Sequence, residues 1–224
     1  MTSPVELRHN RVKVVLHTLA AGPEITGGRA GTRPLLLLHG LGERTARHPP
    51  AHLRWPGPVF GLDFTGHGRS TVPVGGGYTS EVLVGDVDAA LCHLDRPVTV
   101  LGRGLGAYVG LLAAAARPDA VHGTVLADGP GFAGGGVDPG SRSVIRPEIP
   151  SEGGSPDQYA LMELSDDVRP PDYARTLAGF AVDGSGQDTP IWVAATVRPP
   201  WVEAILEVPG VASGTLQEGL DGYC

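Results

Sequence analysis

The chain has 224 residues, 41% of them hydrophobic, with 34 glycines, 21 prolines and a formal net charge of −7 at pH 7. This length suits one α/β domain that buries about three quarters of the surface of its unfolded chain. The acidic balance, without any cluster of Lys or Arg, argues against nucleic acid or an anionic membrane as a partner.

The chain carries no sign of a membrane span or of a secreted, disulfide-bonded protein. No apolar run reaches the roughly 18 residues that a membrane helix requires. Residues 1–4 lead into charged positions rather than into the apolar region of a signal peptide. The two cysteines, Cys92 and Cys224, supply no disulfide framework. We therefore expect a cytoplasmic protein of one domain, residues 1–224, that needs neither a metal nor another cofactor.

The first half of the chain alternates between strand and helix patterns. Apolar and β-branched runs predict strands over residues 5–9, 12–18, 34–38, 58–63, 97–101 and 121–127. Thr79 or Ser80 suits the N-cap of a helix whose apolar residues Val82, Leu83, Val87, Leu91 and Leu94 recur at helical spacing. Strong helix formers predict a second helix over residues 105–116. This alternation favours a mostly parallel sheet with right-handed crossovers.

The second half begins with an irregular segment. Residues 129–156 contain eight glycines and five prolines, which favours a mobile loop. Short helices are expected to follow, one with Tyr159, Leu161, Met162 and Leu164 on a face and one with Tyr173, Leu177 and Phe180 on a face. A strand over 190–196, a short helix over 201–207 and an edge strand from Val211 complete the prediction.

Three glycine-containing turns follow three of the predicted strands. His39-Gly40 follows the strand over 34–38, and residues 63–70 read Asp-Phe-Thr-Gly-His-Gly-Arg-Ser. Residues 102–106 read Gly-Arg-Gly-Leu-Gly between a buried strand and a helix. Taken alone, the last pattern is equally well explained as an ordinary strand-to-helix turn. Their order and spacing together are far more specific.

In these motifs the chain resembles the α/β-hydrolase family. His39-Gly40 resembles the family's loop after its third strand, residues 63–70 its D-x-x-G-H-G-x-S turn, and residues 102–106 its G-x-S-x-G nucleophile elbow. The resemblance covers residues 5–130 well and the remainder loosely. It implies an α/β-hydrolase fold, with a mostly parallel central sheet flanked by helices and a lid-like insertion at about 129–185. That insertion is either a lid that gates a pocket or a solvated surface loop.

The catalytic residues that the resemblance implies are missing from this sequence. Gly104 stands where the elbow carries its serine, and glycine has no side-chain atom that could attack a carbonyl. The strand over 190–196 runs into residues 197–200, Val-Arg-Pro-Pro, without the family's acid. No histidine follows His122, and residues 218–221, Glu-Gly-Leu-Asp, stand where the family has its histidine tail. We therefore expect a degenerate site without a Ser-His-Asp triad and with no catalytic residue of its own.

Several polar residues border the expected pocket. Asp128 ends a strand where some members of the family keep their acid, although a turn-forming role before Gly129-Pro130 is the favoured interpretation. His39 and His67 are expected to brace loops through hydrogen bonds. Arg103 either presents fixed donors to an anion or forms a buried ion pair with Asp63 or Asp128.

The resemblance also implies an anion site made of backbone groups. In the family, an oxyanion hole is built from the N–H groups of the residue after the nucleophile and of the loop after the third strand, which correspond to Leu105 and Leu41. Backbone donors do not depend on side chains, and the helix N-terminus at Leu105 favours negative charge. We therefore expect Leu41, Leu105, Arg103, Gly104, His39 and Asp128 to bind a small apolar ligand with an anionic head.

Two classes of function remain. The first is a non-hydrolytic protein that binds a small molecule or a protein partner. Residues 102–108 also resemble the N-myc downstream-regulated family, a non-catalytic branch with glycine at the elbow followed by Gly-Ala-Tyr. The second is an enzyme with a non-standard site, such as a lyase, an isomerase or a rearranged hydrolase, that works by orientation and oxyanion stabilisation.

Overall fold

The computed structural model describes residues 3–22, 32–138 and 155–224. Its strands are β1 (Val5–His9), β2 (Val12–Ala20), β3 (Leu35–Leu38), β4 (Val59–Asp63), β5 (Val98–Arg103), β6 (Val121–Ala127), β7 (Ile191–Val193) and β8 (Val211–Ser213). Its helices are α1 (Ser80–Leu94), α2 (Leu105–Ala116), α3 (Gln158–Asp166), α4 (Pro171–Ser185), α5 (Pro200–Leu206) and α6 (Leu216–Gly222).

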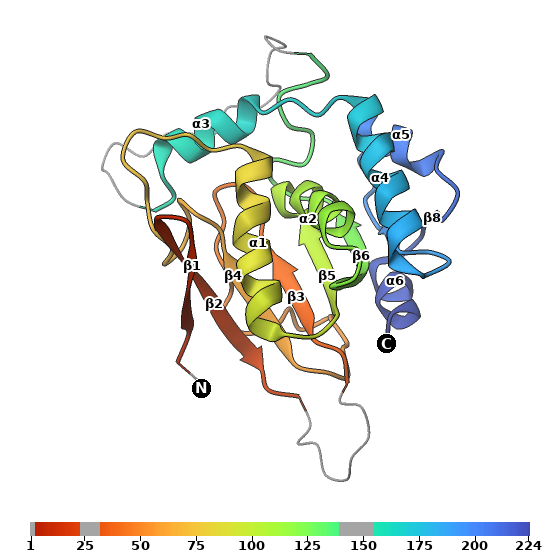
Figure 1. Ribbon diagram of the computed structural model, residues 1–224, viewed down its shortest axis with the longest axis horizontal. Coiled ribbons are helices and arrows are strands. Elements are labelled where there is room, and N and C mark those ends of the chain that lie inside the picture. The colour runs from red at the N-terminus through yellow and green to blue at the C-terminus, as the bar shows by residue number, and fades with distance from the viewer. Residues whose placement is uncertain (1–2, 23–31, 139–154) are drawn as a thin grey trace.

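The strands form one sheet in the order β1-β2-β4-β3-β5-β6-β7-β8. β1 and β2 pair antiparallel, as do β2 and β4, and every later neighbour pairs in parallel. The parallel strands therefore end at the same edge, which lies at the top of Figure 1 and carries the turns at residues 39, 104 and 128. The predicted α/β-hydrolase fold is confirmed.

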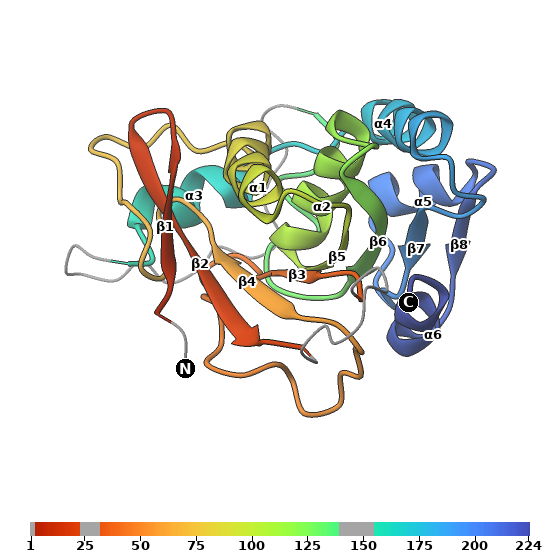
Figure 2. The same cartoon turned by 60° about the horizontal axis from the view of Figure 1, so that its bottom comes forward.

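The core has two parts on opposite faces of the sheet. The larger cluster contains Val100, Leu111 and Ile205 and lies under α1, α2, α4 and α5. The smaller contains Leu35, Val125 and Leu220 and is covered by α6 (Figure 2). Thr79 caps α1 by accepting the N–H of Val82, which confirms the predicted N-cap. No helix among residues 3–22, 32–138 and 155–224 has the length and apolarity to cross a membrane.

The apolar faces expected on the two helices of the insertion are not, as a whole, the faces that the structure buries. In α3, Leu161 and Leu164 are buried, but Tyr159 and Met162 are 40% and 45% exposed. In α4 the buried face consists of alanines 174, 178 and 181, while Tyr173 and Phe180 face solvent. The four residues expected on one face of α3 are therefore divided between a buried and an exposed side. The buried face of α4 consists of alanines because α4 lies close against α2, and small side chains permit that approach.

The C-terminal region also differs. Residues 218–221, which we aligned with the family's histidine tail, lie inside α6, so that alignment is wrong. The loop that follows β8 is instead Gly214-Thr215. The predicted mobile loop over 129–156 falls partly on 139–154, outside the described residues. Its first part is irregular as expected, but Phe132 is buried, so residues 129–136 pack against the body of the protein.

Candidate functional site

Gly104 lies at a sharp turn between β5 and α2. Its backbone has φ +60° and ψ −122°, a left-handed conformation that side chains adopt only under strain. The flanking glycines allow the close packing of this turn. A Cβ at Gly102 would lie 2.2 Å from the carbonyl oxygen of Gly106, and a Cβ at Gly106 would lie 2.5 Å from that of Leu38. The geometry is that of a strand–turn–helix elbow.

The space beside Gly104 is occupied by the chain itself. A Cβ at residue 104 would lie 2.1 Å from the carbonyl oxygen of Pro130. That oxygen accepts two hydrogen bonds, from the N–H of Leu41 at 3.0 Å and from the N–H of Leu105 at 2.9 Å. The two amides that we expected to hold an anion thus converge on one point, and in this structure the peptide carbonyl of Pro130 occupies it.

The segment that carries Pro130 is attached to the helices above the sheet. The carbonyl oxygen of Phe132 accepts the indole N–H of Trp201 in α5 at 3.0 Å and also a guanidinium N–H of Arg169. The backbone N–H of Gly135 donates to the carbonyl of Asp167 at 2.8 Å, and the backbone N–H of Arg169 donates to the carbonyl of Gly136 at 2.8 Å. These bonds hold residues 129–136 in place against the elbow.

Arg169 is the most unusual member of this attachment. Its side chain is buried, and its guanidinium lies 4.5 Å from the centre of the Tyr108 ring in a cation–π contact. Burial lowers the pKa of Arg169 to about 10, so it remains charged at neutral pH. Its Nε and Nη2 and the hydroxyl of Tyr108 have no hydrogen-bond partner among the described residues.

His39 and His67 brace loops, as expected. His39 donates from Nδ1 to the carbonyl of Gly40 at 2.8 Å and accepts the N–H of Phe64 on Nε2 at 3.1 Å. His67 donates from Nδ1 to the carbonyl of Thr65 and accepts the N–H of Gly42 on Nε2. Burial lowers the pKa of both, that of His67 to about 4, so each is a neutral imidazole with both nitrogens engaged.

The side chains of Asp63 and Asp128, at the edge of the sheet, accept hydrogen bonds from backbone N–H groups. Asp63 accepts the backbone N–H groups of Arg69 and Thr45 at 2.9 and 2.8 Å, and the ring N–H at Nε2 of His17 at 2.9 Å. Burial would raise the pKa of Asp63, but these donors outweigh it and lower that pKa. Asp128 accepts the N–H groups of residues 196 and 197 at 2.7 and 3.0 Å, so its carboxylate fastens the loop after β7.

Arg103 forms neither of the ion pairs that we expected. It pairs with Glu43, a residue that no sequence motif indicated. Its side chain is 50% exposed, so the pair is not buried and Asp63 and Asp128 remain bound to backbone. Glu43 also accepts the N–H of Gly40 at 3.0 Å. Arg103 therefore lies at the rim of the elbow and stabilises the turn after β3.

Pro130, Glu43, Trp201 and Arg169 are the parts of this site that the sequence did not reveal. Gly129-Pro130 was visible as a turn, but no pattern says which amides a proline carbonyl accepts. The described residues contain no cluster of three or more His, Cys, Asp or Glu side chains that could hold a metal ion. The loops after β7 and β8, residues 194–199 and 214–215, contain neither a carboxylate nor a histidine.

Comparisons with known proteins agree with this architecture. Over 108 residues the chain is 36% identical to Lipase LipV of Mycobacterium tuberculosis, a stretch that is 45% of this chain and 39% of the lipase. The match thus spans less than half of that relative.

Solved structures show the same fold at low sequence identity. An enol-lactonase from Burkholderia xenovorans has a TM-score of 0.64 at 15% identity, over 95% of this chain and 91% of that one. A hydrolase from Pseudomonas aeruginosa has a TM-score of 0.60 at 21% identity, over 96% and 90% of the two chains. A sequence profile of the Alpha/beta hydrolase family matches residues 35–218. The chain belongs to the Alpha/beta hydrolase family.

Proposed function

We propose that this protein is a non-hydrolytic member of its family that binds a small ligand with an apolar body and an anionic head. The observation that carries the proposal is the pairing of Gly104 with the Pro130 carbonyl. A side chain at 104 would collide with that carbonyl, and the carbonyl fills the position that an oxyanion takes between the amides of Leu41 and Leu105.

The surroundings of the elbow support the absence of acid–base chemistry. A serine-type hydrolase needs a base within hydrogen-bond reach of its nucleophile and a group that orients this base. His39 and His67 have both ring nitrogens engaged with backbone, and the carboxylate of Asp128 fastens the loop after β7. These groups therefore support the fold rather than a proton transfer.

The proposed ligand would compete with the protein's own carbonyl. Two amide donors and the N-terminus of α2 favour a carboxylate or an enolate over a neutral peptide carbonyl, because hydrogen bonds to charged acceptors are stronger. Binding then requires residues 129–131 to move away from Leu41 and Leu105. The apolar body of the ligand would lie against the side chains of these two leucines and the insertion.

Two measurements test the proposal. The protein should not be labelled by serine-directed phosphonates, and it should not hydrolyse activated esters above the background of free imidazole. Stoichiometric labelling of a serine near the elbow, located by peptide mass spectrometry, would overturn the non-hydrolytic assignment. It would favour instead an enzyme with a rearranged site, for which the identity with a lipase is the supporting observation.

Ligand binding is tested separately by titrating the protein with a small apolar carboxylic acid and with the neutral amide of the same acid. The acid should shift the backbone amide resonances of Leu41 and Leu105, whereas the neutral amide should shift them much less. Equal binding of acid and amide would reject an anion site at the elbow. It would favour a surface that recognises a protein partner.

A further inference from the structure

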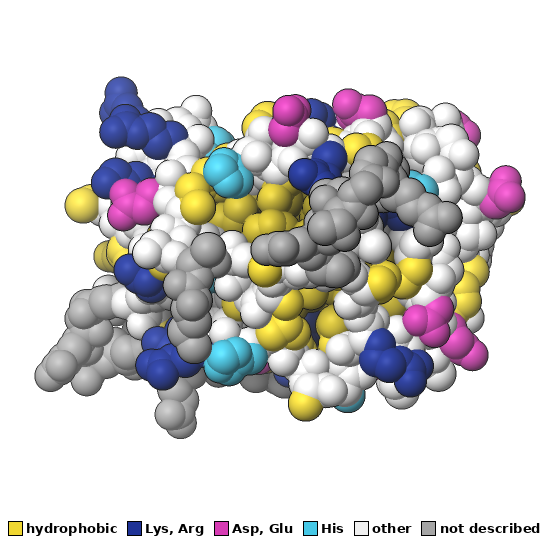
Figure 3. Space-filling model, turned by 90° about the horizontal axis from the view of Figure 1, so that it is seen from below, with side chains coloured by type: hydrophobic (Ala, Val, Ile, Leu, Met, Phe, Trp, Pro, Cys, Tyr) yellow, Lys and Arg dark blue, Asp and Glu magenta, His cyan; other side chains and the backbone are white. Residues whose placement is uncertain are grey.

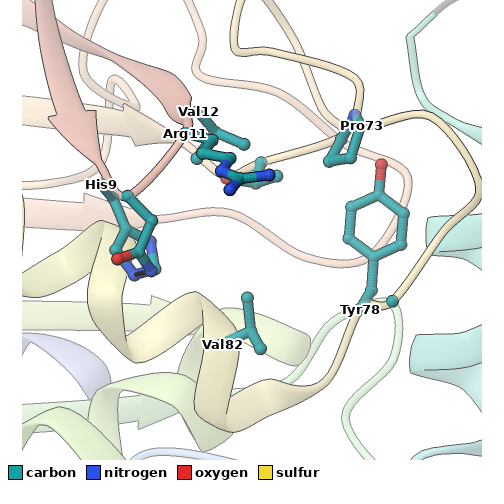
Figure 4. Close-up of a pocket in the computed structure, with 9 residues that line it drawn as sticks. His9, Arg11, Val12, Pro73, Tyr78 and Val82 are labelled. Carbon is teal, nitrogen blue, oxygen red and sulfur yellow. Dashed lines mark hydrogen bonds between the residues drawn. The ribbon is translucent and has the colours of Figure 1, made fainter.

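A cleft of about 440 Å³ lies beside the β1–β2 hairpin, away from Gly104. Figure 4 shows it between this hairpin, the loop that leads to Tyr78 and the first turn of α1. Its lining residues are His9, Asn10, Arg11, Val12, Thr65, Pro73, Gly77, Tyr78 and Val82. Small-molecule sites usually have volumes of roughly 300–1,000 Å³, apolar walls and a few fixed polar groups. This cleft has all three properties.

A buried carboxylate fixes the orientation of His9 at one end of the cleft. The Nδ1 atom of His9 lies 3.1 Å from Oδ1 of Asp86, whose side chain is fully buried in α1. Thr65 holds the same carboxylate through its N–H at 2.8 Å and its hydroxyl at 2.9 Å. Burial raises the pKa of Asp86, although the bonds from Thr65 and His9 oppose that effect. The hydrogen bonds from Thr65 thus fix the Asp86 carboxylate, which in turn fixes the ring of His9.

The helix beneath His9 makes room for its ring. A Cβ at Gly85, in the middle of α1, would lie 2.1 Å from the His9 imidazole. A glycine within a helix costs about 1 kcal/mol relative to alanine. Gly85 nevertheless lies at the position where the ring of His9 packs on α1 and leaves no room for a side chain. The Nε2 atom of His9 lies over the same glycine, 2.1 Å from the position of that Cβ, and 2.9 Å from the side-chain nitrogen of Asn10.

Arg11 supplies a cation at the same end of the cleft. Figure 4 shows its guanidinium directed into the space between His9 and Tyr78. Lys13, two residues along, pairs with Glu6 at 2.9 Å, whereas Arg11 has no ion pair or hydrogen bond from its side chain among the described residues. In Figure 3, Lys and Arg side chains gather on the left, the side on which β1 and β2 lie in Figure 1, in a protein of net charge −7.

The remaining walls are apolar. Val12, Pro73 and Val82 face the cavity together with the ring of Tyr78, whose hydroxyl is engaged with Asp157 at 2.8 Å. Val82 is 41% exposed although it is aliphatic. A ligand that covered Val82 would remove this apolar surface from water, at about 25 cal/mol per Å².

We infer that this cleft binds a small amphipathic carboxylate. The carboxylate forms a charge-assisted pair with Arg11 beside His9 and Asn10, and a short hydrocarbon body lies on Val82, Pro73 and the Tyr78 ring. The site uses none of the residues proposed to bind a ligand at the elbow. It is therefore independent of the proposed function.

The experiment titrates the protein with octanoate and with octanamide while following backbone amide resonances. We expect octanoate to shift residues 9–12 and 77–82 and to bind at least tenfold more tightly than octanamide. Arg11→Gln should weaken octanoate at least tenfold and leave octanamide unchanged. Arg8→Gln, which removes a cation from the same hairpin but not from the cleft, should leave both affinities within twofold.

Each alternative result overturns the inference. Equal affinity for the two probes, equal losses in the Arg8 and Arg11 variants, or no octanoate binding at 10 mM would each reject a carboxylate site here. Shifts confined to Leu41 and Leu105 would reject it as well, and would support the elbow site instead. Val82→Asp is a second variant that places a negative charge at an exposed wall position, and it should abolish octanoate binding without loss of the fold.

Discussion

Gly104 lets the backbone of residues 129–130 approach the turn between β5 and α2 more closely than any side chain would permit. The Pro130 carbonyl then accepts the N–H groups of Leu41 and Leu105. Buried N–H groups are costly without a partner. The absence of a side chain at residue 104 thus allows the Pro130 carbonyl to bond with both amides, so the loops at this edge of the sheet are joined by hydrogen bonds.

The variant Gly104→Ser tests this contact. The new side chain must displace the Pro130 carbonyl, so the free energy of unfolding should fall by about 1–3 kcal/mol, the usual cost of overpacking. Ester hydrolysis should remain at background, because a nucleophile without a base recovers little activity. Urea unfolding and an activated-ester assay measure the two effects.

Gly179→Ser is the matched control, because nothing lies within 4 Å of a Cβ at that position in α4. It should leave stability unchanged or slightly raised, since serine is a better helix former than glycine. Unchanged stability in the Gly104 variant would contradict the contact with Pro130. Turnover comparable to an ordinary esterase would reveal an acid–base pair and contradict the proposed function.

The buried histidines make stability depend on pH. Burial lowers the pKa of His67 to about 4, whereas an unfolded histidine titrates near 6.5. Between these values the unfolded chain binds the proton and the folded protein does not. Stability therefore rises with pH across this window and is lost as the pH falls, by up to about 1.4 kcal/mol per pH unit for this histidine.

The variant His67→Gln should reduce this slope while its amide keeps one donor and one acceptor. Urea unfolding at pH 6.5 and pH 5 measures the slope above the range in which Asp63 titrates. His52→Gln removes an exposed histidine and should leave the slope as it is. An unaltered slope in the His67 variant would show that this residue is not the titrating group.

Among the elements, α6 is held by its first turn. Thr215 accepts the N–H of Glu218 at 3.3 Å, and the Glu218 carboxylate accepts the N–H and hydroxyl of Thr215 at 2.7 and 2.9 Å. This capping box begins the helix directly after β8. The helix covers the smaller core cluster through Leu220 and, beyond its end, Tyr223.

Removal of this cap should destabilise the whole protein. Thr215→Ala loses the side-chain acceptor, and we expect a loss of about 0.5–2 kcal/mol in the free energy of unfolding by urea. Thr215→Ser keeps the hydroxyl and should lie within a few tenths of a kcal/mol of the unmodified protein. Equal stability of the alanine and serine variants would mean that the cap does not contribute.

The insertion and the edge of the sheet are coupled through Phe132. The Phe132 carbonyl accepts hydrogen bonds from Trp201 and Arg169, and the centres of the Phe132 and Trp201 rings lie 5.1 Å apart. Residues 129–136 are therefore held by α5 and by the segment after α3. The coupling predicts slow hydrogen exchange for the amides of Leu41 and Leu105.

Trp201→Phe keeps an aromatic ring in the core but removes the donor to Phe132. We expect exchange at Leu41 and Leu105 to accelerate several-fold relative to Leu111 in the middle of α2, as measured by NMR. Trp192→Phe removes a comparable indole bond, to the carbonyl of Thr215 at 3.0 Å, and should not affect these two amides. The same acceleration in both variants would indicate general loosening instead of a specific attachment.

Local sequence predicted most elements because their signals are local. The strand predicted over 97–101 and the helix predicted over 105–116 correspond to β5 and α2, and Thr79, one of the two predicted N-cap residues, caps α1. The helix α6 was missed although its capping box was present as Thr215 and Glu218, because the alignment to a family tail overrode it. Which side of α3 and α4 is buried does not follow from the positions of their apolar residues, because hydrophobicity alone does not show which neighbouring element approaches.

The family, the place of the elbow and the glycine at its centre could be predicted from the sequence alone, because these depend on short motifs whose backbone geometry is local. The group that occupies the elbow, by contrast, follows from how distant segments of the chain pack together. Pro130 lies 26 residues after Gly104 in the chain, yet its carbonyl meets Leu41 and Leu105, because parallel strands end at one edge and bring their loops together. The fold likewise places Arg11, His9 and Val82 around one cleft. Such contacts depend on packing between distant segments, and no periodicity in a single sequence records them.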